Sequence, residues 1–309
     1  MWGQLVHNGF LNQGFGTSKM APWRAGANEN TTIEFSTPVM IEGKDVPAGK
    51  YGLFIAYDSI NPILILSKNN SSWGGYFYNE QEDQLRVPVK ALPNSELVEF
   101  LKYEFTDQQP HAAVISLQWE RMKIPFKIET DYKTLQMESF RNELRTDKGF
   151  DWRAYSQAAN FSLQNDLHLE EGLFWADKAI SETFIGQRNF ITLTTKGQIL
   201  EKLKRSTEAA ELFKEAIPLA TMQQLHVYGR QLLLQKKNKE AFEIFKLNYE
   251  KHPNQFTTNF GMARAYSANA NYKKALEFAE RASAQAPDPA NKSGIERIIE
   301  LLKEGRDGN

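Results

Sequence analysis

Residues 23–32 read Trp-Arg-Ala-Gly-Ala-Asn-Glu-Asn-Thr-Thr and run directly into Ile33-Glu34-Phe35. Residues 23–32 combine an aromatic ring, a cation, an amide and a carboxylate with small residues, whereas a plain turn requires only Gly, Asn or Asp. The three that follow alternate apolar and polar side chains, as a half-buried strand does. The stretch therefore predicts a structured loop that leads into the first strand of a β-rich region.

The two-residue period continues beyond this stretch, with turn chemistry at residues 42–45 and 47–49. Pro88 marks an edge or a bulge, and Pro125 is expected to interrupt the last strand, because proline cannot donate to a strand ladder. The expected strands are Thr31–Ile41, Tyr51–Tyr57, Ile63–Leu66, Leu85–Val89, one or two within Val98–Phe105, Ala113–Trp119 and Lys123–Glu129. Short strands separated by frequent turns predict an antiparallel β-sandwich or jelly roll.

From about Tyr132 the apolar spacing becomes helical, and a repeat close to 34 residues appears. That length, with small residues where paired helices touch and proline after the second helix, resembles tetratricopeptide repeats. The repeated positions are Asn160, Leu163, Gly172, Ala176 and Ala179; Gly197, Leu200, Ala209, Phe213 and Ala216; Gly229, Leu232, Ala241, Phe245, Asn248 and Pro253; and Ala263, Tyr266, Ala275, Ala279, Ala282 and Pro287. Leu301 and Leu302 belong to an expected capping helix, which a stacked array needs.

The predicted organisation is a β-sandwich domain over residues 1–130, a linker helix within 131–150, and an α-helical superhelix over 151–309. About four helix pairs and one capping helix are expected in the second domain.

Three motifs of the first domain occur together in order: residues 23–32, Pro-Ala-Gly-Lys-Tyr-Gly-Leu-Phe at 47–54, and Trp73-Gly74. With them, this half resembles the 2911 family of domains of unknown function. That family has no established activity, so the resemblance implies a fold and no reaction. Its members carry an export signal, so the resemblance also implies an exported, periplasmic bacterial protein, although Met1-Trp2-Gly3 does not open a signal peptide.

The candidate ligand-binding residues of this domain are Trp23, Arg24, Asn28, Glu29, Lys50 and Trp73. In one interpretation, Arg24 and Glu29 meet a small polar or carbohydrate ligand while a tryptophan supplies a stacking face. In the other, an Arg24–Glu29 pair only braces the loop, and Trp73 is packing. An enzyme with its site around Arg24, Glu29 and Lys50 is the alternative function.

In the repeats, the first helix of each pair is expected to line a groove for a protein or peptide partner. Aligned by the repeat, the groove-facing side chains include Phe161 and Gln198. The candidate groove residues are His226, Arg230, Phe260 and Arg264, and the two arginines are suited to clamping a carboxylate. The predicted function is accordingly a non-enzymatic binding or scaffolding protein.

Composition excludes several other classes. The chain has no Cys, so thiolate chemistry is absent, and its five His residues do not show metal-ligand spacing, so neither a metal nor a cofactor is expected. The chain has 37 basic and 38 acidic residues, and this balance does not indicate a basic surface for nucleic acid. The sequence contains no apolar run long enough for a membrane span.

Overall fold

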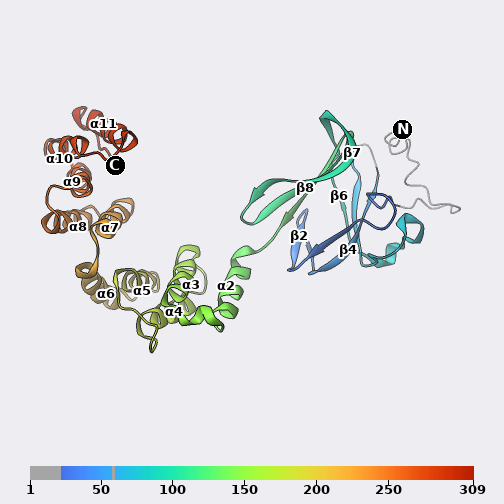
Figure 1. The fold of residues 1–309 in the computed structure, drawn as a ribbon, viewed down its shortest axis with the longest axis horizontal. Coiled ribbons are helices and arrows are strands. Elements are labelled where there is room, and N and C mark those ends of the chain that lie inside the picture. Colours follow the sequence, from blue (N-terminus) through green and yellow to red (C-terminus); the bar gives the residue numbers. More distant parts are fainter. Residues whose placement is uncertain (1–21, 58–59) are drawn as a thin grey trace. The chain divides into compact units, whose positions relative to one another are not determined.

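The computed structural model describes residues 22–57 and 60–309. The chain divides into two units, Met1–Gln136 and Met137–Asn309, and the boundary falls within helix α2, Tyr132–Glu143 (Figure 1). Each unit is described separately below. The domain limits expected from the sequence stay a prediction. The expectation that Met1-Trp2-Gly3 does not open a signal peptide concerns residues outside the described part.

The described residues of the first unit form two four-stranded sheets in which every paired neighbour is antiparallel (Figure 1). One sheet has the order β1 (Thr32–Phe35), β4 (Gly49–Ala56), β5 (Ile63–Ser67) and β6 (Asp83–Pro88). The other has the order β3 (Lys44–Val46), β2 (Val39–Ile41), β8 (Ala112–Glu129) and β7 (Leu92–Gln109). The predicted antiparallel sandwich is confirmed.

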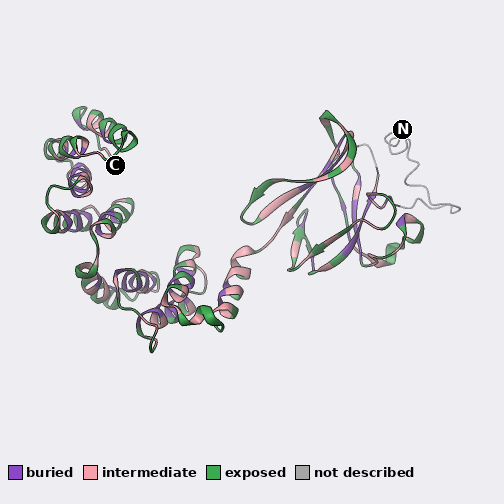
Figure 2. Ribbon diagram, viewed as in Figure 1, coloured by how far each residue is buried: buried purple, intermediate pink, exposed green. Residues whose placement is uncertain are grey.

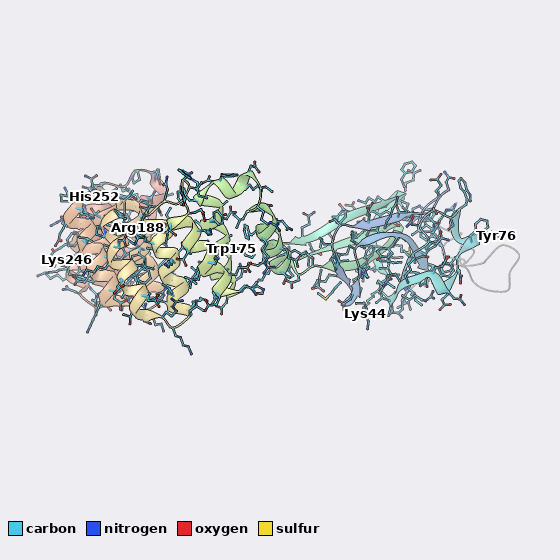
Figure 3. The ribbon with its side chains drawn as sticks, turned by 90° about the horizontal axis from the view of Figure 1, so that it is seen from below. Lys44, Tyr76, Trp175, Arg188, Lys246 and His252 are labelled. Atoms are coloured by element: carbon cyan, nitrogen blue, oxygen red, sulfur yellow. The ribbon has the colours of Figure 1, made fainter. Side chains whose placement is uncertain are left out.

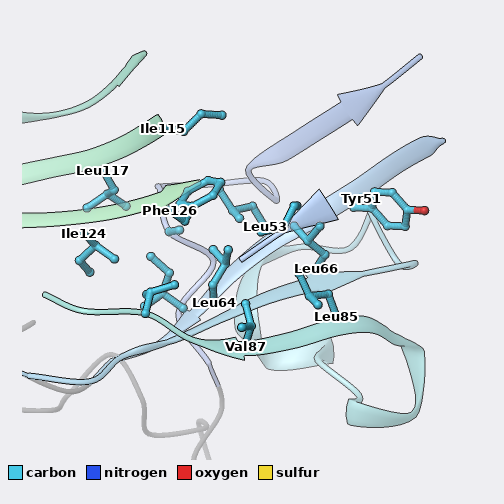
Figure 4. Packing of buried hydrophobic residues seen from close by; sticks show 14 of the residues in the cluster. Tyr51, Leu53, Leu64, Leu66, Leu85, Val87, Ile115, Leu117, Ile124 and Phe126 are labelled. Atoms are coloured by element: carbon cyan, nitrogen blue, oxygen red, sulfur yellow. The ribbon is translucent and has the colours of Figure 1, made fainter. Parts of the chain in front are cut away.

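The core of this unit lies between the two sheets and follows from the two-residue period. Tyr51 and Leu53 of β4 point to the side that also receives Leu64 and Leu66 of β5 (Figure 4), and Ile55, two residues further along β4, belongs to the same cluster. Leu117, Ile124 and Phe126 of β8 complete the same cluster from the second sheet (Figure 4). Phe54 points the other way yet is also buried, because the ring of Tyr78 lies 5.4 Å from its own.

The structure corrects one predicted turn and several predicted strands, among them Thr31–Ile41, which is divided into β1 and β2 of different sheets. Lys44 and Asp45 belong to β3 rather than to a turn, because Glu42 and Gly43 alone make the reversal, both with positive φ. Residues 92–109 form one continuous strand, and so do residues 112–129. Pro125 does not interrupt β8, because it lies between Lys123, which pairs with β7, and Ile128, which pairs with β2. Its missing N–H therefore removes no ladder hydrogen bond.

The second unit is helical, and its burial alternates along each helix as an amphipathic pattern requires (Figures 1 and 2). Its helices after α2 are α3 (Trp152–Asn165), α4 (Leu169–Ser181), α5 (Phe190–Lys202), α6 (Ser206–Leu219), α7 (Met222–Leu234), α8 (Asn238–Lys251), α9 (Phe256–Ala268), α10 (Tyr272–Ala284) and α11 (Pro289–Lys303). These antiparallel pairs confirm the predicted tetratricopeptide-type superhelix.

Small residues set the distance between paired helices. A side chain at Gly229 of α7 would begin 2.7 Å from the ring of Phe245 of α8, and one at Gly261 of α9 would begin 2.5 Å from the same ring. The aromatic ring of α8 therefore occupies the space that the two glycines leave empty. Helix starts are marked by capping boxes, such as Thr221 with Gln224 before α7.

Candidate functional site

The loop at residues 23–32 is anchored to the first sheet through Trp23. The Trp23 N–H donates to the Ile55 carbonyl at 2.9 Å, and the Ile55 N–H donates back at 2.8 Å. The indole ring is 5% exposed, stacks on Trp119 of β8 with centroids 5.7 Å apart, and donates from Nε1 to the Gly26 carbonyl. Trp23 thus joins β4 to β8, and its ring is covered by protein.

A second anchor ties the loop to β7. Ala25 is fully buried, and its carbonyl accepts a hydrogen bond from the Tyr103 hydroxyl at 2.6 Å. Burial raises the pKa of Tyr103 above its usual value, so the hydroxyl keeps its proton and remains a donor. The loop therefore contacts both sheets through its first three residues.

Arg24 lies between these anchors and reaches another part of the predicted site. Its guanidinium packs against the backbone of Gly74, where an added Cβ would come 2.5 Å from Arg24 Nη1. Gly74 also has a φ of +70°, so a side chain there would strain the backbone as well as displace the end of the Arg24 side chain. Arg24 Nε is buried and has no hydrogen-bond partner among the described residues. The structure thus brings Arg24 into contact with Gly74 of the Trp73-Gly74 motif, a contact that the order of the motifs in the sequence did not predict.

The other candidates of this unit face solvent. Asn28, Glu29 and Lys50 are exposed, and within the described residues no ion pair joins Arg24 to Glu29. Trp73 is 61% exposed, and it neighbours the equally exposed Tyr76, which projects outward (Figure 3). A hollow of about 240 Å³ in this unit is lined by residues 42, 89, 90, 92, 114 and 125–127, and none of the candidates contributes to it. The ligand-binding assignment stays a prediction.

The four groove candidates lie on two neighbouring first helices. His226 and Arg230 are one turn apart on α7, and Phe260 and Arg264 are one turn apart on α9. The His226 and Phe260 rings stack with centroids 6.1 Å apart, and the Arg264 guanidinium carbon lies 4.5 Å above the Phe260 ring. The structure therefore brings three of these side chains into one continuous stack, which we call the α7/α9 stack (His226, Phe260 and Arg264).

Burial and mutual repulsion shape the electrostatics of this stack. Burial, helped by the positive charges of Arg264 and Arg230, lowers the pKa of His226 to about 4, so the imidazole is neutral at pH 7. Burial and the charge of Arg230 lower the pKa of Arg264 to about 10, and the nearby Asp307 acts in the opposite direction. Arg264 is therefore partly desolvated beside the positive charge of the exposed Arg230, and Arg264 Nε has no hydrogen-bond partner in the described part of the chain.

The His226 shift predicts a pH-dependent stability. The folded state binds this proton only near pH 4, whereas an unfolded histidine binds it near 6.5, so the stabilisation is complete above pH 6.5 and is lost as the pH falls toward 4. Between pH 7 and pH 4.5 we expect His226 to remove about 2–3 kcal/mol from the free energy of unfolding of the helical unit. Urea unfolding at both pH values measures this loss, and His226→Phe is the comparison variant because it lacks the titrating imidazole. Equal losses in the two proteins would contradict the prediction.

A hollow on the first helices shares α7 with the stack, and most of its lining residues were not predicted from the sequence. This hollow of about 540 Å³ spans the first helices α3, α5 and α7. It is lined by Leu163, Gln164, Gln198, Glu201, Lys202, Gln231, Leu234 and Gln235. Gln198 directly follows the small residue Gly197, as Arg230 follows Gly229 and Arg264 follows Ala263. The repeat position therefore predicted one lining residue, Gln198. Most of the other lining residues lie in the C-terminal turns of α3, α5 and α7.

Neither a membrane-spanning helix nor a cluster of metal ligands is present in the described residues. No helix there has both the length and the apolar character that crossing a membrane demands. No three acidic or histidine side chains in that part of the chain gather as a metal site.

Comparison with known structures finds several similar chains. YrrB, described as a tetratricopeptide-repeat protein with an unusual peptide-binding site, is 19% identical, with 56% of this chain and 87% of that chain covered and a TM-score of 0.33. MamA from Desulfovibrio magneticus is 18% identical, with 52% and 88% covered and a TM-score of 0.35. PilF of Pseudomonas aeruginosa is 19% identical, with 57% and 81% covered and a TM-score of 0.35.

Comparison with protein families supplies the identification. No curated protein matches the chain. Residues 1–128 match the family "Protein of unknown function (DUF2911)", and residues 232–295 match "Tetratricopeptide repeat". The two matches confirm both resemblances predicted from the sequence, so the chain combines a DUF2911 domain with tetratricopeptide repeats.

Proposed function

We propose that the protein is a binding or scaffolding protein that holds an acidic segment of a partner protein in the groove of its repeats. Tetratricopeptide repeats imply a protein or peptide partner. The observation that carries the acidic preference is the α7/α9 stack, with Arg230 beside it. Arg264 has a buried, unpartnered Nε, and its pKa is lowered by burial and by the charge of Arg230. A carboxylate placed between the two arginines would offset the repulsion between their positive charges and would accept a hydrogen bond from the unpartnered Arg264 Nε.

The neighbouring hollow fits the rest of such a segment. Four of its lining side chains are glutamine amides, which offer both donors and acceptors. An extended peptide has unpaired backbone N–H and C=O groups that match amides of this kind. Leu163 and Leu234 add apolar contact area in the same hollow. In this proposal, the arginines of α7 and α9 bind the negative charge of the ligand, and the glutamines of α3, α5 and α7 bind its backbone.

A peptide array tests the preference. Peptides of equal length that are acidic, neutral or basic are offered to the wild-type protein, to the double variant Arg230→Ala/Arg264→Ala, and to Arg281→Ala. Arg281 is the matched control, because it stacks on Phe278 of α10, a second helix of a pair. We expect retention of acidic peptides to fall at least about tenfold in the double variant, consistent with about 1.4 kcal/mol or more from charge-assisted hydrogen bonds, and to persist in the control.

Charge-independent retention, or full retention by the double variant, would refute the proposal. Retention of acidic peptides by the wild-type protein should also weaken as salt rises, because partly exposed charges are screened. The enzyme alternative around Arg24, Glu29 and Lys50 gains no specific support, since Glu29 and Lys50 are exposed and Arg24 pairs with neither of them in the described residues.

A further inference from the structure

The residues that follow α11 turn back toward α9. Gly305 has a φ of +70°, its N–H donates to the Leu302 carbonyl, and the Arg306 N–H donates to the Leu301 carbonyl. This is the geometry of a helix C-cap built on a left-handed glycine. The cap ends the helix and reverses the chain, so residues 307–309 return over the first helix of the preceding pair.

Residues 307–309, which we call the terminal segment, make four hydrogen bonds to α9 and two within themselves, one of which runs from Asn309 Nδ2 to Asp307 Oδ1 at 2.8 Å. The Ser267 hydroxyl donates to the Asp307 carboxylate at 2.5 Å and accepts from the Gly308 N–H at 2.9 Å. Asn309 Nδ2 donates to the Arg264 carbonyl at 3.1 Å, and Arg264 Nη1 donates to Asn309 Oδ1 at 3.3 Å. The Asn309 N–H closes the segment by donating to Asp307 Oδ1 at 3.2 Å.

The fit of the terminal segment depends on the absence of a side chain at its centre. A Cβ on Gly308 would come 2.6 Å from Cγ2 of Ile298, a β-branched residue of α11 that cannot easily move that atom. Ser267 is 2% exposed, so its hydroxyl is covered once the segment is in place. The segment is therefore seated between α9 and α11 by a specific sequence, Asp-Gly-Asn, and not merely lying on the surface.

The seat of the terminal segment and the α7/α9 stack share a residue. Arg264 stacks on Phe260 and also bonds to Asn309, and Ser267 lies three residues further along the same helix. Asp307 brings a negative charge to the side of the groove where Arg230 and Arg264 repel each other. The terminal segment therefore supplies locally the kind of charge that the proposed function assigns to a partner.

We propose that the terminal segment is an intramolecular occupant of the acidic-peptide site, and that a partner segment with a carboxylate followed by a small residue binds α9 by displacing it. The inference rests on the proposed function. A tethered segment competes at an effective concentration on the order of millimolar, so it weakens binding of a separate peptide without abolishing it. Its Asp-Gly-Asn sequence also defines the probe that the site should accept.

Docking is measured directly by amide hydrogen exchange in the full chain. The Gly308 and Asn309 amides both donate hydrogen bonds when the segment is seated, so we expect them to exchange at least tenfold more slowly than in the free peptide. In Gly308→Ala the two amides should exchange at the free-peptide rate. Gly294→Ala is the matched control, because an added Cβ at that α11 position meets nothing within 4 Å. Free-peptide exchange in the wild-type chain would overturn the inference.

Displacement is measured with a labelled peptide of sequence Gly-Arg-Asp-Gly-Asn. A chain ending at Arg306 keeps the cap of α11 and should bind the probe at least tenfold more tightly than the full chain. Gly308→Ala in the full chain should match the shortened chain, and Arg264→Ala in the shortened chain should lose the probe. Equal binding by the full and shortened chains would overturn the inference. If the probe results hold while the peptide array shows no dependence on Arg230 and Arg264, the proposed function alone fails.

Discussion

Replacing Phe245 with alanine is expected to lower the free energy of unfolding of the helical unit by about 3–5 kcal/mol. The ring is 1% exposed and fills the space left by Gly229 on α7 and Gly261 on α9, with the His226 ring edge-on at 5.6 Å. Neither glycine has a side chain that can move into the cavity, so the surrounding helices cannot close it cheaply. Each repeat is stabilised mainly by its neighbours, so the loss should spread to the contacts of α7, α8 and α9.

Urea unfolding followed by far-ultraviolet circular dichroism measures this loss, because the helical unit dominates that signal. Phe184→Ala is the control, since the Phe184 side chain is fully exposed in the loop between α4 and α5 and its removal should change stability by less than about 0.5 kcal/mol. A loss below about 1 kcal/mol for Phe245→Ala would show that the helices collapse into the cavity. The close packing described around the two glycines would then be wrong.

Replacing Trp23 with alanine is expected to lower the stability of the β-sandwich unit by about 3–5 kcal/mol. The change removes a ring that is 5% exposed, its stacking on Trp119, and its hydrogen bond to the Gly26 carbonyl. Aromatic stacking adds about 0.5–1.5 kcal/mol beyond the area that is buried. The loop would then hold the two sheets together only through backbone contacts and the bond from Tyr103 to Ala25.

Native-state hydrogen exchange at the amides of β4 and β5 measures this loss within the sandwich itself. Trp73→Ala is the matched control, because it removes the same side chain from the second tryptophan motif, where the ring is 61% exposed. We expect the control to change stability by less than about 0.5 kcal/mol. Equal effects of the two substitutions would contradict the assignment of Trp23 to the core and of Trp73 to the surface.

Much of the fold was predictable because periodicity is a local property. The alternation in residues 51–57 and the continuous apolar run at residues 63–66 predicted two strands, and Leu53 and Leu64 of these strands meet in the core. The length of β8 was not predictable, because whether Pro125 breaks a strand depends on which neighbour lies beside it. The proline falls between the β7 and β2 ladders, and that partner exchange is visible only in three dimensions.

The groove shows the same division. The repeat period placed His226, Arg230, Phe260 and Arg264 on equivalent first helices, because helical positions one turn apart share a face. The stacking order of these side chains, the lowered pKa of His226 and the seating of the terminal segment did not follow from that period. Each of them depends on burial and on contacts between residues about 30–45 positions apart, such as Arg264 with Asn309.

The opening loop separates the two kinds of information most clearly. Residue types and order in Trp23–Thr32, together with residues 47–54 and Trp73-Gly74, were sufficient to recognise the domain, since sequence motifs require no coordinates. Only the tertiary structure decided that Trp23 is buried, that Arg24 packs on Gly74, and that Asn28 and Glu29 face solvent. The physical reason is that side chains adjacent in sequence diverge in a loop, and distant strands determine which of them are covered.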